Sequence, residues 1–279
     1  MGISKQAVFS NNKQALLYEQ NLLELMREVE LLREEHPGCG LEKMYFTLQP
    51  KFIGRDAFIE MFMDLGFRVR KFKNYRRTTF SSDTYYENLI NGATIGSFGD
   101  IWQTDITYIS IVERFFYAVY IIDVYTRIIV GYNVAKTLQA ESNIIALKMA
   151  SKKYGYPKIH HSDRGTQYTS KKYTALLQAN GTEISMGKCA QENAYAERIN
   201  LTIKDEYLRY RQLNSYEDLL KENQKAVKNY NEKRIHNKLG RKTPIQFYNE
   251  INSRLKLGLP LVIHDYQNHI QENKQTPKK

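Results

Sequence analysis

The sequence contains few cysteines and no long apolar run. Cys39 and Cys189 are too few for a disulfide framework or a cysteine-rich zinc site, and they fit a reducing compartment. No apolar stretch reaches the roughly 18 residues of a membrane-spanning helix. The N-terminus also lacks the charged and then apolar pattern of a secretion signal. We therefore expect a soluble, cytoplasmic protein that does not enter a membrane.

Acidic residues are outnumbered by basic ones. The chain has 41 Lys and Arg against 30 Asp and Glu, which gives a formal net charge of +11. Such an excess indicates a polyanionic partner, of which nucleic acid is the usual one. At 279 residues the chain is long enough for a catalytic core and a smaller second domain.

One carboxylate lies inside a segment that otherwise predicts a buried strand. Residues 101–112 are mostly apolar, and Asp105 occupies the middle of this run. An ionised carboxylate in a core costs several kcal/mol unless something compensates its charge. A bound metal ion is one such compensation.

Two more carboxylates follow at positions that suit the same site. Asp163 comes directly after a short predicted strand at residues 158–162 and just before Gly165. Glu197 belongs to a predicted helix at residues 193–211. On that helix, steps of four, three and four residues define a polar stripe that consists of Asn193, Glu197, Asn200 and Lys204.

Together these carboxylates predict a two-metal site. Asp105, Asp163 and Glu197 offer hard oxygen ligands without a cysteine or histidine cage, which favours Mg²⁺, with Mn²⁺ as a substitute, over zinc. Two such ions about 3.5–4 Å apart serve in-line displacement at phosphorus. Each carboxylate alone is more often an ordinary polar residue. We expect His160 and His161 to line the site or to be structural.

Three sequence blocks resemble the signature blocks of the retroviral-integrase-like DDE transposases, and more narrowly the second-reading-frame protein of bacterial insertion sequences of family three. They are residues 102–108 (Trp-Gln-Thr-Asp-Ile-Thr-Tyr), 161–170 (His-Ser-Asp-Arg-Gly-Thr-Gln-Tyr-Thr-Ser) and 193–197 (Asn-Ala-Tyr-Ala-Glu). The resemblance extends over most of the chain. The spacing between Asp163 and Glu197 is slightly shorter than is usual in the family, and Arg198 stands where the family usually has Ser. We expect a trimmed, flexible loop at residues 185–192.

The resemblance implies roles and partners. Asp105, Asp163 and Glu197 would be the catalytic, metal-binding triad, and Lys204 would contact transposon-end DNA. The implied partners are terminal inverted repeats, target DNA, further copies of the chain on the DNA ends, and an upstream-frame helix-turn-helix product as a partner or fusion. The implied fold is α/β and ribonuclease-H-like, with an N-terminal helical, helix-turn-helix-like DNA-binding region.

The chain divides into five predicted regions. Residues 1–78 form a helical DNA-binding region, 79–100 a linker, 101–212 the ribonuclease-H-like core, 213–259 a C-terminal helical extension and 260–279 a tail. Predicted strands lie at 101–112, 115–122, 128–135, 158–162 and 183–186, and predicted helices at 141–154, 170–180, 193–211 and 216–230. A short helix is expected near residues 85–90. Asp100 and Asp123 are expected to be structural, Asp123 in a turn and an ion pair with Arg127.

The N-terminal region has four expected helices and a basic segment. Helical patterns cover residues 3–9 and 13–35, the longer being either a packing helix or a short oligomerisation seam. Residues 41–48 and 55–65 form a helical pair that is either a helix-turn-helix or a plain hairpin. The segment after it alternates aromatics with candidate phosphate-contacting cations, which are Arg68, Arg70, Lys71, Lys73, Arg76 and Arg77. Near the C-terminus, Lys233, Arg234, Lys238, Arg241 and Lys242 could extend this DNA surface.

The sequence thus predicts a DNA transposase that cleaves at insertion-sequence ends and transfers a 3′-hydroxyl strand. Two alternatives remain at this point: a nuclease of the same fold that cuts without joining, and a catalytically silent DNA-binding regulator.

Overall fold

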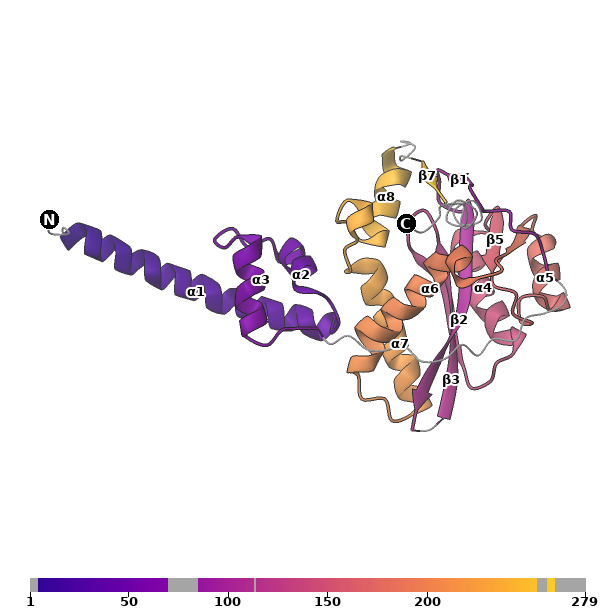
Figure 1. The fold of residues 1–279 in the computed structure, drawn as a ribbon, viewed down its shortest axis with the longest axis horizontal. Helices are drawn as coiled ribbons and strands as arrows, with labels where there is room; N and C mark the ends of the chain where they lie inside the picture. The colour runs from indigo at the N-terminus through magenta and orange to yellow at the C-terminus, as the bar shows by residue number, and fades with distance from the viewer. Residues whose placement is uncertain (1–4, 70–84, 113, 255–259, 264–279) are drawn as a thin grey trace, which may run out of the picture. The chain divides into compact units, whose positions relative to one another are not determined.

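The computed structural model describes residues 5–69, 85–112, 114–254 and 260–263 (Figure 1). The chain separates into two compact units, Met1–Lys73 and Asn74–Lys279. Each unit has a hydrophobic core of its own. The five regions expected from the sequence remain a prediction. In the part of the chain that the structure describes, no helix is long and apolar enough to cross a membrane.

Within its described residues the first unit has three helices. They are α1 (Lys5–Glu35), α2 (Leu41–Leu48) and α3 (Arg55–Asp64). The two helices expected before residue 36 are a single continuous one, whereas α2 and α3 follow their predicted ranges closely. Val29, Met44, Phe58 and Phe62 are completely buried between the three helices. The use of α2 and α3 as a helix-turn-helix remains a prediction.

The basic segment that follows α3 falls mostly outside the described residues. Arg68 is described and exposed to solvent. The other five candidate cations, Arg70, Lys71, Lys73, Arg76 and Arg77, lie outside the described residues.

The second unit is built on a mixed five-stranded sheet. Its strands are β2 (Ile101–Ile111), β3 (Arg114–Asp123), β4 (Ile129–Ala135), β5 (Ile159–Ser162) and β6 (Glu183–Met186), in the spatial order β4-β3-β2-β5-β6. The meander β2-β3-β4 is antiparallel, and β5 and β6 continue the sheet in parallel with β2. All five strands lie within two residues of their predicted ranges, because their apolar runs are bounded by turn-forming residues. The order is the one expected of a ribonuclease-H-like fold.

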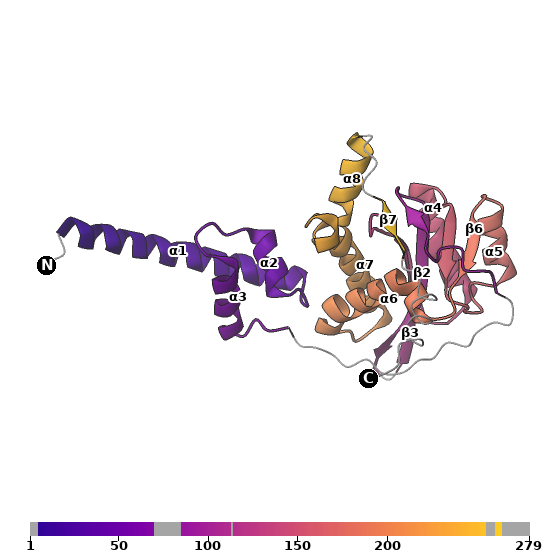
Figure 2. The same cartoon turned by 45° about the horizontal axis from the view of Figure 1, so that its top comes forward.

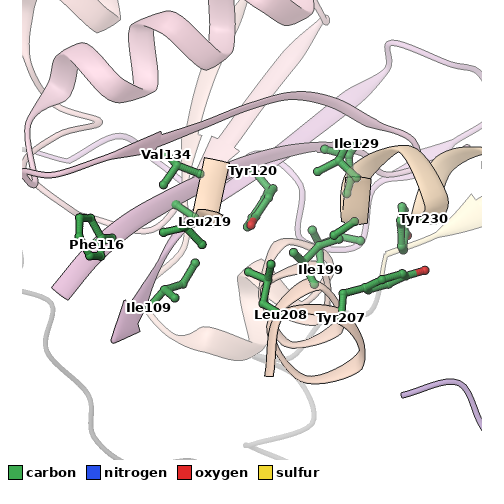
Figure 3. Close-up of a cluster of buried hydrophobic side chains, with 14 of the residues drawn as sticks. Ile109, Phe116, Tyr120, Ile129, Val134, Ile199, Tyr207, Leu208, Leu219 and Tyr230 are labelled. Carbon is green, nitrogen blue, oxygen red and sulfur yellow. The ribbon is translucent and has the colours of Figure 1, made fainter. Parts of the chain in front are cut away.

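Helices cover both faces of this sheet (Figures 1 and 2). On one face, α4 (Ala140–Tyr154) and α5 (Lys171–Gln178) enclose a core that includes Trp102, Ile121 and Leu147. On the other face, α6 (Ala194–Leu201) and α7 (Tyr216–Glu232) cover the side chains drawn in Figure 3. Tyr120 and Ile199 belong to this second core. The central strand β2 is therefore buried on both sides.

One end of the sheet is closed by segments that the sequence left unassigned or assigned differently. The two-residue strands β1 (Thr94–Ile95) and β7 (Leu261–Val262) pair antiparallel, and α8 (Pro244–Arg254) precedes β7. Ile95 and Ile263 are buried in the cluster formed there. The predicted tail at 260–279 therefore begins with a strand.

The prediction of a helix near residues 85–90 is wrong. The segment is not helical, and Glu87 O accepts a hydrogen bond from Met186 N at 3.2 Å. Leu89 N donates to Ser185 Oγ at 2.9 Å. The segment is bound to the edge strand β6, and these bonds to β6 take the place of helical ones.

The segment predicted as one helix at residues 193–211 adopts three helical geometries in succession. It begins with a 3₁₀ turn (Ala190–Asn193), continues as α6, and then passes through a π-helix (Thr202–Tyr207) and a 3₁₀ turn (Leu208–Tyr210). The flexible loop expected at 185–192 is also different. Its first two residues belong to β6, its last three belong to the 3₁₀ turn, and Glu192 Oε2 accepts from Lys188 N at 2.6 Å.

Candidate active site

Asp105 lies at the middle of the central strand, where its side chain is half-buried. The parallel register of β2 and β5 pairs Gln103 with His161. The pairing ends there, and Asp163 follows directly after β5, close enough to Asp105 for its charge to raise the pKa of that residue. Asp163 is fixed by a tight turn, because its Oδ1 accepts from Gly165 N at 3.0 Å. A Cβ at Gly165 would lie 3.0 Å from the same oxygen, so glycine leaves the space that this turn requires.

The helix that bears Glu197 is attached to β2 at its first turn. Gln103 Oε1 accepts from the backbone N–H groups of Tyr195 and Ala196 at 3.1 and 3.4 Å. These donors have no partner within a helix, so the glutamine side chain caps them. Asn193 Nδ2 adds a bond of 2.8 Å to Thr104 O. The start of α6, and with it Glu197, is thereby held over β2.

The predicted polar stripe of this helix faces β2 along its length. Asn200 Nδ2 donates to Asp105 Oδ2 at 2.8 Å, and Lys204 Nζ donates to Thr107 Oγ1 at 3.2 Å. Lys204 lies in the π-helix, a geometry that occurs often at functional sites. Its half-buried ammonium thus belongs to the same surface as the carboxylates.

The three predicted carboxylates interact electrostatically. Burial raises the pKa of Asp105 to about 8, and the negative charges of Asp163 and Glu197 contribute to this rise. Hydrogen bonds from the Ile106 backbone N–H and from the Asn200 amide oppose it. Burial and the nearby Arg209 lower the pKa of Lys204, although the charge of Asp105 acts in the other direction.

The donor set suits a hard divalent cation. Three carboxylates whose charges repel one another are stabilised when a cation binds between them. The described residues contain no group of three His, Cys, Asp or Glu side chains already gathered around one point.

The two histidines beside this site are structural, as one of the two expectations had it. His160 Nε2 lies 2.6 Å from the Tyr173 hydroxyl, and His161 Nδ1 lies 2.8 Å from Ser185 Oγ. Burial lowers the pKa of each to about 3, so both rings are neutral at pH 7. They support the strands behind the carboxylates.

Asp100 and Asp123 are structural, as the sequence predicted. Asp100 accepts from the backbone of Gly96 and Ser97 and pairs with Lys158 at 2.7 Å. Asp123 is buried and accepts from Gly99 N and from both donors of Thr126. The expected ion pair of Asp123 with Arg127 is not among the described contacts; the Arg127 guanidinium lies over the Tyr195 ring, 4.0 Å from its centre.

One of the C-terminal cations is not available to DNA. Arg234 is only 6% exposed and forms a two-pronged ion pair with Glu206, with both N–O distances 2.8 Å. Its predicted place on a DNA surface is therefore wrong. A charge run in the sequence does not reveal that one of its members has a buried partner in the π-helix.

Two supporting side chains were not predicted from the sequence. Gln103 and Asn200 position the helix and Asp105, but neither was a candidate site residue. The available signals were their places two residues before Asp105 and three residues after Glu197, the latter on the same helical face.

The chain matches a known protein family. Residues 98–191 and 181–244 match two family models, both described as Integrase core domain. The chain is 31% identical over 204 residues to the 31 kDa protein of insertion element IS600 from Shigella sonnei, with 70% of this chain and 75% of the relative covered. It is 31% identical over 230 residues to the transposase of IS629 from the same species, with 80% and 78% covered. The chain belongs to the insertion-sequence transposases with an integrase core.

Further similarities agree with this transposase family. Transposase InsF of IS3fB from Escherichia coli K12 is 30% identical over 154 residues, which cover 53% of this chain and 54% of the relative. A chain of the simian T-cell lymphotropic virus intasome, solved in complex with the PP2A regulatory subunit B56 gamma, shares the fold. Its TM-score is 0.50 at 16% identity, with 80% of this chain and 77% of the viral chain covered.

Family membership decides between the functional alternatives. The chain is a DNA-transposing enzyme of the DDE class, and it acts on DNA. Neither a nuclease that cuts without joining nor a silent DNA-binding regulator is favoured by these relatives.

Proposed function

We propose that Asp105, Asp163 and Glu197 are the metal-binding catalytic residues of this transposase. The observation that supports the proposal is the geometry around Asp105: the helix that bears Glu197 binds its Oδ2 through Asn200, and burial together with the charges of Asp163 and Glu197 raises its pKa. Perturbed carboxylates that act on one another are common in active sites. Mg²⁺ is the proposed ion, and Mn²⁺ is the proposed substitute.

The bound ions supply Lewis-acid activation for an in-line displacement at phosphorus. The protein supplies position. Asn200 orients Asp105 by holding its Oδ2, Gln103 holds the first turn of the helix bearing Glu197, and the turn at Gly165 holds Asp163. No serine or tyrosine is needed as a nucleophile, because water attacks first and the freed 3′-hydroxyl attacks second.

The proposed DNA partners are the terminal inverted repeats of the element and a target duplex. The net charge of +11 supports a large phosphate-contacting surface. Lys204 is the proposed contact to end DNA beside the carboxylates, and the six cations from Arg68 to Arg77, directly after the helices of the first unit, are further proposed DNA contacts. Assembly of several copies on paired ends, an upstream-frame helix-turn-helix partner or fusion, and a place in the bacterial cytoplasm with the nucleoid belong to the same proposal.

The test is nicking and joining of a labelled duplex that carries the element's own terminal repeat, with Mg²⁺ and then with Mn²⁺. The unchanged chain is compared with Asp163→Asn and with Asp100→Asn, a matched control at a structural carboxylate. We expect nicking and joining by the unchanged chain and the control, and neither by Asp163→Asn. If the product fused to its upstream frame is active and retains activity with Asp163→Asn, the assignment of the triad is wrong.

A further inference from the structure

Arg164, the residue directly after Asp163, has an unusual environment. Its guanidinium carbon lies 3.7 Å from the centre of the Tyr85 ring. Tyr85 is 55% exposed, although it is a large aromatic side chain. A planar cation stacked on an aromatic face is attracted by the ring electrons, and both groups retain edges with which to contact a ligand.

The stacked pair is held at the same end of the sheet as Asp163. Arg164 belongs to the turn that follows β5. Tyr85 begins the segment that is bound to the adjacent strand β6 through Glu87 O and Leu89 N. The neighbouring Tyr86 packs against the core beneath α4 and α5. Both partners are therefore anchored to strands whose carboxyl ends lie next to the candidate active site.

The charge of Arg164 is not neutralised by a carboxylate within the described residues. Among the described ion pairs none involves Arg164, and its buried Nε has no hydrogen-bond partner there. The side chain turns to Tyr85, although Asp163 is its neighbour in sequence. A half-buried guanidinium with no ion pair among the described residues is suited to bind an anionic ligand.

A second cation–aromatic pair shows how the exposed Tyr85 differs from a tyrosine that packs in the core. Lys136 lies over Tyr216 at 4.6 Å, just after β4 on the opposite edge of the sheet. The Tyr216 ring stacks on Phe116, and its hydroxyl donates to Val134 O at 2.7 Å. That tyrosine is used by the core, whereas Tyr85 presents more than half of its surface to solvent.

We propose that Arg164 and Tyr85 form a subsite for the DNA strand that flanks the reacting phosphodiester. The guanidinium contacts a backbone phosphate, and the exposed ring stacks on an unpaired base next to it. Base stacking on aromatic side chains combined with a cation on the backbone is the usual chemistry of single-strand contacts. The inference rests on the proposed function, since it takes the position of the reacting phosphate from Asp105, Asp163 and Glu197.

The experiment uses the full chain and duplexes of the element's own terminal repeat that end in a single-stranded flank, each with 2-aminopurine at one unpaired position of that flank. Fluorescence quenching reports stacking and is measured with EDTA, so that it does not depend on cleavage. The variants are Tyr85→Ala, Tyr85→Phe, Arg164→Ala and Arg164→Lys, with Lys136→Ala as the matched control. Thermal melting of each variant checks that it is folded.

We expect quenching at one flanking position with the unchanged chain, the control and Tyr85→Phe, and its loss with Tyr85→Ala. Affinity should fall about tenfold with Arg164→Ala, the scale of a lost base or phosphate contact, and Arg164→Lys should restore only part of it, because lysine does not stack as a plane. Equal quenching and affinity in all folded variants would overturn the subsite.

Nicking with Mg²⁺ distinguishes failure of this inference from failure of the proposed function. If the subsite alone is wrong, the folded Tyr85 and Arg164 variants nick as Lys136→Ala does, while Asp163→Asn is inactive. If the proposed triad is wrong, Asp163→Asn nicks as well as the unchanged chain.

Discussion

Asp105 and Asp100 are two aspartates close together in the sequence whose surroundings act on them in opposite directions. Burial and two neighbouring carboxylates raise the pKa of Asp105. Burial also acts to raise the pKa of Asp100, but hydrogen bonds from Lys158, Gly96 and Ser97 outweigh it and hold that pKa below its ordinary value. The same residue type therefore weakens the metal-free fold at one position and strengthens it at the other.

The effect of Asp105 on stability depends on pH with a definite sign. The folded-state pKa is about 8, and an unfolded aspartate has a pKa of about 4. Between these values the folded state retains a proton that the unfolded state has lost. The stabilisation that this proton gives the folded state is therefore fully present below about pH 4 and is lost as the pH rises towards 8.

We predict that Asp105→Asn stabilises the metal-free protein. After allowance for solvent screening, the free energy of unfolding should rise by about 2–4 kcal/mol at pH 8 and by less than about 1 kcal/mol at pH 5. Urea denaturation in EDTA at the two pH values measures this difference. Asp100→Asn is the control and should instead lose about 1 kcal/mol at pH 8. A loss of stability at pH 8 for both variants would contradict the proposed crowding of charges.

The ion pair between Glu206 and Arg234 joins the π-helix to the segment after α7. Replacing the buried Arg234 leaves Glu206, which is only partly exposed, without this two-pronged partner, at a cost of about 2–3 kcal/mol. We predict that Arg234→Gln lowers the free energy of unfolding by this amount. Lys233→Gln, at the exposed neighbour, should change it by less than about 0.5 kcal/mol. The double change Glu206→Leu and Arg234→Leu should recover much of the loss, and chemical denaturation of the four proteins measures these values.

The contact between β4 and α4 depends on one glycine. A Cβ at Gly131 would lie 2.2 Å from Ala146 O and 2.9 Å from Ala150 Cβ. Backbone cannot move aside cheaply, so we predict that Gly131→Ala lowers the free energy of unfolding by about 3 kcal/mol. Gly96→Ala is the matched control, since a Cβ there meets nothing within 4 Å. Equal melting temperatures of the two variants would show that the helix shifts without cost.

Elements that depend on residues close together in the sequence were predictable from it. The five strands were found because apolar runs end at turns, and the hypothesis that Asp105, Asp163 and Glu197 share one site was drawn from strand order, helix face and the family resemblance. The conversion of α6 into a π-helix was not predictable, since the 3.6-residue period continues through it. The burial of Arg234 and the docking of residues 85–90 on β6 depend on partners far away in the sequence. Local patterns do not contain that information.

The molecule as a whole combines two separate cores with a surplus of positive charge. Phe58 and Phe62 belong to the core of the first unit, and Trp102 and Tyr120 belong to cores of the second. The acidic residues of the candidate site are concentrated in the second unit. The sequence places six closely spaced cations, from Arg68 to Arg77, directly after the helices of the first. The positive surplus lies mostly in residues 74–279. The proposed phosphate contacts therefore extend over both units, whereas the proposed phosphodiester chemistry belongs to the second.

The salt dependence of DNA binding tests whether the basic segment after α3 contacts DNA phosphates. Each phosphate contact releases counterions and contributes about 0.9 to the slope of log K against log salt concentration on duplex DNA. We predict that replacing Arg70, Lys71 and Lys73 by serine makes the slope less steep by about 2–3 and lowers affinity for any sequence. The control replaces Lys148, Lys152 and Lys153, three exposed cations of α4, so the net charge falls equally. Because counterion release depends on contacts and not on total charge, the control slope should stay unchanged; equal slopes for both triple variants would assign the effect to net charge alone.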